Sequence, residues 1–355
     1  MNIAPEMQTK PHFQTLDGLR GVAAIAVVIF HFMEIAIPVP DNNFIAHAYL
    51  AVDFFFCLSG FVIAYAYDDK IANIGIGTFL KRRFIRLHPL VVIGSVLGLL
   101  TFIFDPFSNL IQSYSGKIVL MFVLSCLMIP FPAVKERYLN LFHLNPPTWS
   151  LFWEYIANIV YAIVLVKLPK KLLWVLTALA AVALVLESIH SKHLSVGWGG
   201  ENIRGGGIRV AFSFLAGMMI YRSGWIIKSK LGFVSLSLLL LPAFLFPFSE
   251  TFSWIADPLV VILYFPLLIM LGAGSLTQKA NAVCRFSGKI SYPLYMVHYP
   301  FIWIFFSYVE KFKPTMNDFV WVIVIGTALL LAFAYVVMKY VDDPIRKWLS
   351  KGKAS

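Results

Sequence analysis

Long apolar runs separated by short polar links make up most of this chain of 355 residues. A helix needs about 20 apolar residues to cross the hydrocarbon core of a bilayer. About ten runs meet that length, and we predict membrane-spanning helices at 19–38, 48–67, 88–105, 149–168, 172–190, 207–222, 231–249, 253–274, 290–309 and 318–341. A shorter run at 118–133 ends in Pro130 and Pro132. The pattern therefore predicts an all-α, polytopic membrane helix bundle.

The distribution of Lys and Arg sets the predicted orientation, because short basic links stay on the cytoplasmic side. Basic residues gather in the links at 68–86, 167–171, 222–230 and 279–289 and in the last residues of the chain, whereas 39–47 and 250–252 hold none. Both termini are therefore predicted to be cytoplasmic, which requires an even number of crossings. The basic links all fall inside if 118–133 does not cross. We predict that it is a re-entrant or interfacial segment on the outer side, with 134–147 outside.

Composition supports this class and excludes others. The chain is 59% hydrophobic and 13% charged, whereas soluble proteins carry about 25% charged residues. We expect one membrane domain over 1–355, with cytoplasmic tails at 1–15 and 343–355. The net charge of +11 fits membrane orientation and does not indicate a nucleic-acid partner. The three cysteines lack the spacing of metal ligands or of a disulfide framework, so we expect neither a metal nor a bound cofactor.

The first predicted span carries Arg20 and His31, eleven positions apart. At 3.6 residues per turn both side chains lie on one face of a helix, about 16 Å apart along its axis. Ionisable side chains inside membrane segments favour a functional site. Taken singly, Arg20 also fits a surface anchor and His31 a hydrogen-bonded helix contact.

Further ionisable residues are expected near the depth of His31, in the outer part of the membrane. They are Glu34, Asp53, Glu154 and His298. A carboxylate beside an imidazole fixes its tautomer and raises its basicity, as a general base requires. We therefore predict that Asp53 or Glu154 orients His31. A polar cluster that only holds helices together remains the alternative.

On the cytoplasmic side, helical spacing places Arg83 and Arg86 on neighbouring faces, where two guanidinium groups can bind phosphate oxygens together. Membrane anchoring explains the same charges without a ligand. Ser59 is expected to bond within its own helix. Gly94 and Gly98 indicate close helix packing, and the glycine-rich stretch 197–207 is expected to be a flexible linker.

Five ordered motifs, spread along almost the whole chain, resemble those of the acyltransferase 3 family of integral membrane O-acyltransferases. They are Leu16-Asp17-Gly18-Leu19-Arg20-Gly21 with His31, Asp53-Phe54-Phe55-Phe56 with Ser59-Gly60-Phe61, Arg83-x-x-Arg86, Trp149-Ser150-Leu151 with Glu154, and Ser291-Tyr292-Pro293-Leu294-Tyr295 with His298. Asp342-Asp343-Pro344 departs from the Glu-Arg-Pro of many members. The chain resembles the stand-alone form without an appended hydrolase-like domain.

The resemblance implies an acyl-CoA donor, usually acetyl-CoA, that enters from the cytoplasm, and a carbohydrate acceptor on a surface glycan or a lipid-linked precursor. It also implies a multi-pass protein of the bacterial inner membrane. The roles expected are His31 as general base with Asp53 or Glu154, donor binding by Arg20, Arg83 and Arg86, and a site or acceptor path lined by Ser59, Trp149, Tyr292, Tyr295 and His298.

Two alternatives stay open at this point. An acyl-histidine intermediate would use the same residues as direct transfer. A transporter or channel would use buried His, Asp, Glu and Arg as a proton or substrate pathway, although we find no inverted repeat or paired broken helices in the sequence.

Overall fold

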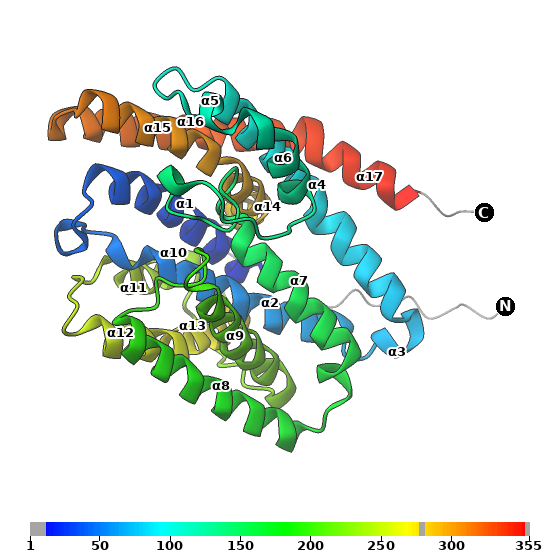
Figure 1. Cartoon of the computed structure of the whole chain (residues 1–355). Helices are drawn as coiled ribbons and strands as arrows, with labels where there is room; N and C mark the ends of the chain where they lie inside the picture. Colours follow the sequence, from blue (N-terminus) through cyan, green and yellow to red (C-terminus); the bar gives the residue numbers. More distant parts are fainter. Residues whose placement is uncertain (1–11, 277–280, 352–355) are drawn as a thin grey trace.

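The structure is a computed structural model that describes residues 12–276 and 281–351. Within these two ranges the regular elements are helices, with no β-strand, and the long ones lie side by side in a bundle (Figure 1). Eight helical segments are long and apolar enough to cross a membrane, counting the short turns that continue some of them. Their main helices are α1 (Gln14–Ala36), α2 (Ala51–Tyr67), α4 (Ile76–Ile103), α7 (Thr148–Ile163), α8 (Lys170–Ser191), α9 (Ile203–Ser223), α12 and α13 (Ser253–Leu259 and Phe265–Ala273) and α16 (Met316–Val337). The predicted polytopic helix bundle is confirmed.

The two other predicted crossings are interrupted helices. The interrupted pairs are α10 with α11 (Phe233–Leu240 and Pro242–Leu245) and α14 with α15 (Asn281–Val297 and Tyr299–Phe312). The second break falls at His298, just before Pro300, which has no N–H to continue the hydrogen-bond ladder. The segment predicted as one span at 290–309 is therefore two helices that meet at a histidine.

The short apolar run predicted not to cross forms α6 (Ile118–Cys126) and then irregular backbone. Near the end of α6, the hydroxyl of Ser125 lies 2.8 Å from that of Ser95, inside α4. The chain then turns back towards the end of α4. The guanidinium of Arg137 lies 4.7 Å from the ring of Phe102, close to that end. This segment enters and leaves the bundle at the same end, as a re-entrant segment does.

The start of α1 and the helix α17 (Asp343–Lys351) lie at one end of the bundle, which we call the basic end. The charge of Arg346 in α17 acts on Arg20 in α1, and Figure 1 shows α17 and the short helix α3 (Ile71–Ile74) on the same side. The Lys and Arg residues at this end are among those from which the cytoplasmic side is predicted. The outer parts of both predicted tails, at 1–11 and 352–355, and the basic residue Lys279 lie outside the described residues.

Two helix pairs form the centre of the bundle, α1 with α14 and α2 with α9. In the second pair a Cβ added to Gly60 would lie 2.0 Å from the carbonyl oxygen of Phe214. A Cβ added to Gly217 would lie 1.8 Å from that of Cys57. Glycine is required at both positions because the two backbones touch, and this contact fixes how α9 presents its polar side chains to α2.

Two glycines of α4, Gly94 and Gly98, pack against the irregular chain before α7, and Gly94 also packs against the backbone of Met296 in α14 (Asn281–Val297). A Cβ at Gly98 would lie 2.2 Å from the carbonyl oxygen of Leu144, and one at Gly94 would lie 2.2 Å from the amide nitrogen of Asn145. Part of the stretch expected to be a linker is also ordered, since Gly205, Gly206 and Gly207 belong to α9. Irregular backbone at this depth is tolerated where protein surrounds it or where it lines a cavity.

Candidate active site

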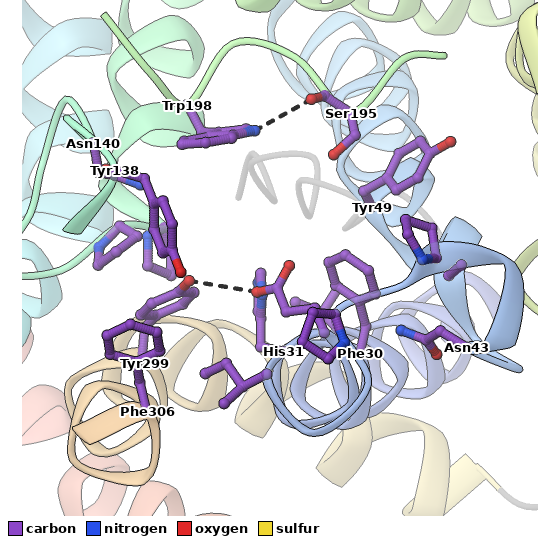
Figure 2. Close-up of a pocket in the computed structure, with 18 of the residues that line it drawn as sticks. Phe30, His31, Asn43, Tyr49, Tyr138, Asn140, Ser195, Trp198, Tyr299 and Phe306 are labelled. Carbon is purple, nitrogen blue, oxygen red and sulfur yellow. Dashed lines mark hydrogen bonds and ion pairs between the residues drawn. The ribbon is translucent and has the colours of Figure 1, made fainter. Parts of the chain in front are cut away.

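Figure 2 shows a cavity of about 550 Å³. It is lined by residues near the end of α1, among them His31 and Glu34, and therefore lies away from the basic end, where α1 begins. Its walls come from α1, the connection between α1 and α2, the irregular stretches before α7 and α9, and the pair α14 and α15. Aromatic side chains form much of the surface, among them Phe30, Tyr49, Trp149, Trp198, Tyr299 and Trp303. Polar side chains stand between them. Three of the predicted site residues line the cavity: His31, Trp149 and Tyr295.

His31 lies in the cavity wall with a carboxylate as its partner. Its Nδ1 atom is 2.6 Å from Oε1 of Glu34, and the hydroxyl of Tyr299 donates to the same oxygen at 3.4 Å (Figure 2). When the Nδ1–H of a neutral imidazole donates to a carboxylate, the lone pair is on Nε2. This is the arrangement of a general base with an orienting acid.

His298 stands behind His31 at the break between α14 and α15. The two rings stack with their centroids 5.3 Å apart and an interplanar angle of 21°. The Nδ1–H of His298 donates to the carbonyl of Leu294 at 3.1 Å, and its Nε2 is buried without a hydrogen-bond partner among the described residues. His298 is fully buried, so it supports the ring of His31 and does not itself line the cavity.

Asp53, predicted to orient His31, is instead the partner of Arg209. The Nη2 atom of Arg209 lies 2.6 Å from Oδ2 of Asp53, and its Nε lies 3.1 Å from the same oxygen. Arg209 also donates to the carbonyls of Val196 and Tyr49. Both charges are fully buried. The ion pair joins α9 to α2, and Arg209 lies in the wall of the cavity.

Arg209 is not among the predicted site residues, although a charged residue inside an apolar run of spanning length favours a functional role. Its guanidinium lies 5.3 Å from the ring centre of Trp149, which the sequence did place at the site. The ion pair therefore supports the aromatic wall of the cavity.

Glu154, the other predicted partner of His31, lies away from it. Its Oε1 accepts hydrogen bonds from Nη2 of Arg83 at 2.8 Å and from the hydroxyl of Ser59 at 2.7 Å. The expectation that Ser59 bonds within its own helix is therefore wrong. Glu154 joins α7 to α4 and α2, on the side of the arginine residues.

The three arginines predicted to bind the donor are brought together at the basic end. Arg20 donates to the hydroxyl of Ser291 at 2.9 Å and to the carbonyl of Gly288. The charges of Arg20, Arg83 and Arg346 all act on Arg86, whose side chain is exposed. Arg346, from α17, is a member of this cluster that the motif comparison did not single out.

The two tyrosines of the late motif have different surroundings. Tyr295 lines the cavity, with its hydroxyl 2.8 Å from that of Ser150. The hydroxyl of Tyr292 donates to the carbonyl of Leu87 at 2.6 Å. Tyr292 therefore lies between α14 and α4 and does not line the cavity, contrary to the role predicted for it.

A second buried polar group, missed in the sequence, joins the chain before α2 to α12. The Nε2 atom of His47 lies 3.1 Å from the hydroxyl of Ser253 and 3.5 Å from a carboxylate oxygen of Asp257, and its Nδ1 donates to the carbonyl of Phe246. In a nucleophilic triad the acid bonds Nδ1, so the three side chains hold the fold together. Among the described residues no three His, Cys, Asp or Glu side chains are placed to hold a metal ion.

Comparison with known proteins identifies the family. Residues 13–339 match the family model described as an acyltransferase domain. The chain belongs to the acyltransferase 3 family. No solved structure matches the chain.

Two curated proteins match the chain with different sequence identity and over different lengths. Over 42% of its length the chain is 42% identical to protein 2 in the picA locus of Rhizobium radiobacter, and the match covers 81% of that protein. Over 96% of its length it is 25% identical to the O-acetyltransferase OatA of Staphylococcus aureus. The chain spans 58% of the length of OatA.

Proposed function

We propose that this multi-pass membrane acyltransferase acts as one membrane domain that moves an acyl group, in the first instance acetyl, from cytoplasmic acyl-CoA to a carbohydrate hydroxyl. The observation that carries the proposal is the pair of His31 and Glu34 in the wall of an aromatic cavity. The arginine cluster lies at the opposite end of the bundle. The membrane concerned is the bacterial inner membrane.

In the proposed reaction His31 acts as general base. Its Nε2 removes the proton of the acceptor hydroxyl while the oxygen attacks the thioester carbonyl. The carbon–sulfur bond breaks, and the departing thiolate receives the proton from His31, so that acyl ester and CoA are the products. Glu34 accepts the hydrogen bond of Nδ1 and stabilises the positive imidazolium that forms between the two steps.

The donor would be held at the basic end. Arg20, Arg83 and Arg86 come from two helices, and guanidinium groups bind phosphate oxygens with two parallel hydrogen bonds. Glu154 fixes the side chain of Arg83. The arm that carries the thioester would then follow α1 towards His31, about 16 Å along the helix axis from Arg20.

The acceptor would occupy the cavity. Its volume falls in the range of about 300–1,000 Å³ usual for small-molecule sites. Aromatic faces suit the C–H faces of a sugar ring, and Asn43, Asn140 and Ser195 are lining residues that can bond its hydroxyls. A carbohydrate is therefore the acceptor class that the lining favours.

The test is acyl transfer in the native host. The gene is deleted and restored as wild type, as His31→Ala, or as His190→Ala, which changes an exposed histidine of α8. Surface glycans are then analysed for base-labile esters by mass spectrometry. We expect an ester that disappears on deletion and returns with wild type and His190→Ala only. Unchanged glycans would direct attention to a different acceptor or to a transporter, and binding of CoA to the purified protein separates these two.

A further inference from the structure

Arg137 is a buried cation in the cavity wall that the proposed transfer does not use. It ends a short 3₁₀ turn, Lys135–Arg137, in the irregular connection between α6 and α7. The residue is 2% exposed and lines the cavity.

Two aromatic rings lie against this guanidinium, and most of its N–H donors are unused among the described residues. Arg137 lies over the rings of Phe102 and Trp303, with 4.7 Å to each ring centre. A guanidinium has five N–H donors. Among the described residues one hydrogen bond uses them, from Nη1 to the carbonyl of His143 at 2.7 Å.

Arg137 also lacks the carboxylate that the other buried arginines have. The structure describes three buried arginines, and Arg83 and Arg209 each form an ion pair. The carboxylate whose charge acts on Arg137 is Asp105. Its two oxygens already accept hydrogen bonds from the hydroxyl of Ser307 and the backbone N–H of Phe107. Within the described ranges no carboxylate lies at ion-pair distance from Arg137.

The group stays charged at neutral pH. Burial lowers the pKa of Arg137 to about 9, because a poorly solvated environment disfavours the charged form. Burial, together with the charge of Arg137, also lowers the pKa of His143 to about 4, so this neighbour is neutral. A buried cation without a counter-charge is costly and favours binding of an anion.

The backbone beside Arg137 is strained in a way typical of ligand sites. Tyr138 and Leu139 have φ values of 55° and 49°, in the left-handed region that residues with a Cβ rarely adopt. Such conformations persist where surrounding contacts enforce them, and they cluster at sites that clamp ligands. Here a contact just after the strained residues joins this segment to the stretch before α9, because the backbone N–H of Leu141 donates to the carbonyl of Trp198 at 2.9 Å.

We propose that the acyl acceptor carries an anionic group, a carboxylate or a phosphate on the sugar, and that Arg137 binds it in the cavity wall. The inference rests on the proposed function, in which the cavity holds the acceptor. An arginine edge matches the two oxygens of such a group. Arg137 thereby determines which carbohydrates enter, and His31 acts on a hydroxyl of the bound sugar.

Binding of three matched sugars to the purified full chain tests this assignment without any donor. The probes are methyl glucoside, methyl glucuronide and methyl glucoside 6-phosphate, which differ at one carbon. Quenching of tryptophan fluorescence reports each dissociation constant. The variants are Arg137→Gln, Arg137→Lys and, as a matched control, Lys135→Gln, which removes an exposed charge from the same turn.

We expect wild type and Lys135→Gln to bind at least one anionic sugar about 10- to 100-fold more tightly than methyl glucoside, the range of a hydrogen bond to a charged group. Arg137→Gln should abolish this preference, and Arg137→Lys should retain part of it. The anion that binds more tightly identifies the carboxylate or the phosphate as the group recognised.

Equal binding of all three sugars by the wild type would overturn the proposal. So would an Arg137→Gln variant that weakens all three equally, because the arginine would then only clamp the loop. The wild-type comparison stands even if the Arg137 variants fail to fold. Transfer from acetyl-CoA is measured separately, so loss of the proposed function and loss of the anion site give different results.

Discussion

The carboxylate of Glu34 lies one helical turn after His31 in α1, with its Oε1 atom 2.6 Å from the Nδ1 of the imidazole. Residues three apart on a helix are neighbours on its surface, so α1 alone supplies both members of the pair. The partner predicted from other helices, Asp53 or Glu154, is occupied by an arginine in each case.

Glu34→Gln should lower kcat by about tenfold or more, which corresponds to about 1.4 kcal/mol of transition-state free energy. The amide can still accept a hydrogen bond from Nδ1, but it does not stabilise the positive imidazolium as a carboxylate does. His31→Ala should lose more, in the range of about 10²–10⁴ expected for a positioned base. Steady-state transfer from acetyl-CoA measures both variants.

Glu310→Gln is the control for this prediction, because Glu310 also lines the cavity and is not bonded to His31. We expect its kcat to equal that of the wild type. A normal kcat for Glu34→Gln would remove Glu34 from the mechanism. Trapping of an acyl-protein that depends on His31, in the absence of acceptor, would show an acyl-histidine intermediate in place of direct transfer.

The ion pair of Asp53 and Arg209 should act on stability. Removing one partner of a buried pair costs about 3–5 kcal/mol, because the remaining charge is buried alone. Asp53→Ala should therefore lower the unfolding temperature of the purified protein strongly. Replacing both side chains, Asp53→Leu with Arg209→Met, should recover much of the loss, since apolar side chains can replace a buried pair at little cost.

Thermal unfolding and transfer are measured on the same samples, with Asp41→Ala as a control at an exposed position before α2. If Asp53→Ala unfolds like the wild type but has no transfer activity, Asp53 acts in catalysis as the sequence suggested. A double variant that is less stable than Asp53→Ala would also contradict the structural role.

The parts of the structure set by local composition could be predicted. The length of the apolar runs defines the bundle, and the distribution of Lys and Arg indicated that 118–133 does not cross alone. The spacing of Arg20 and His31 depends only on one helix, and the structure places them at the basic end and in the cavity wall respectively.

Partners on different helices could not be predicted from depth. Asp53 and Glu154 were grouped with His31 because all three were expected at similar levels in the membrane. Depth in the membrane does not determine which helix a given side chain faces. Asp53 contacts α9, and Glu154 contacts α4. The position of Arg137 in the cavity wall could not be predicted either, because irregular backbone places it there and such backbone has no periodic pattern in the sequence.

Arg86→Ala should raise the KM for acetyl-CoA about tenfold or more, the value of one hydrogen bond to a charged group. Acetyl-pantetheine carries the thioester without the phosphates, so its KM should not change. Arg86 is suited to this test because its side chain is exposed beside Arg20, Arg83 and Arg346. Initial rates with the two donors measure the effect.

Arg82→Ala is the matched control, since Arg82 is an exposed neighbour in α4, and we expect it to leave both KM values unchanged. Equal increases for acetyl-CoA and acetyl-pantetheine in Arg86→Ala would indicate a disturbed helix. An unchanged KM for acetyl-CoA in Arg86→Ala would show that Arg86 does not bind the donor. Membrane anchoring would then explain its charge.

Cysteine labelling should place the connection before α7 on the outer side of the membrane. Lys135 is exposed in that connection and Arg82 is exposed at the basic end, so Lys135→Cys and Arg82→Cys report the two faces. Cys57 and Cys284 are buried, and Cys126→Ser removes the partly accessible native thiol. A membrane-impermeant maleimide added to intact spheroplasts should label Lys135→Cys only, and permeabilised spheroplasts should show both. Labelling of Arg82→Cys alone in intact spheroplasts would reverse the orientation, because the cavity and its acceptor would then face the cytoplasm and the arginine cluster could not meet cytoplasmic acyl-CoA.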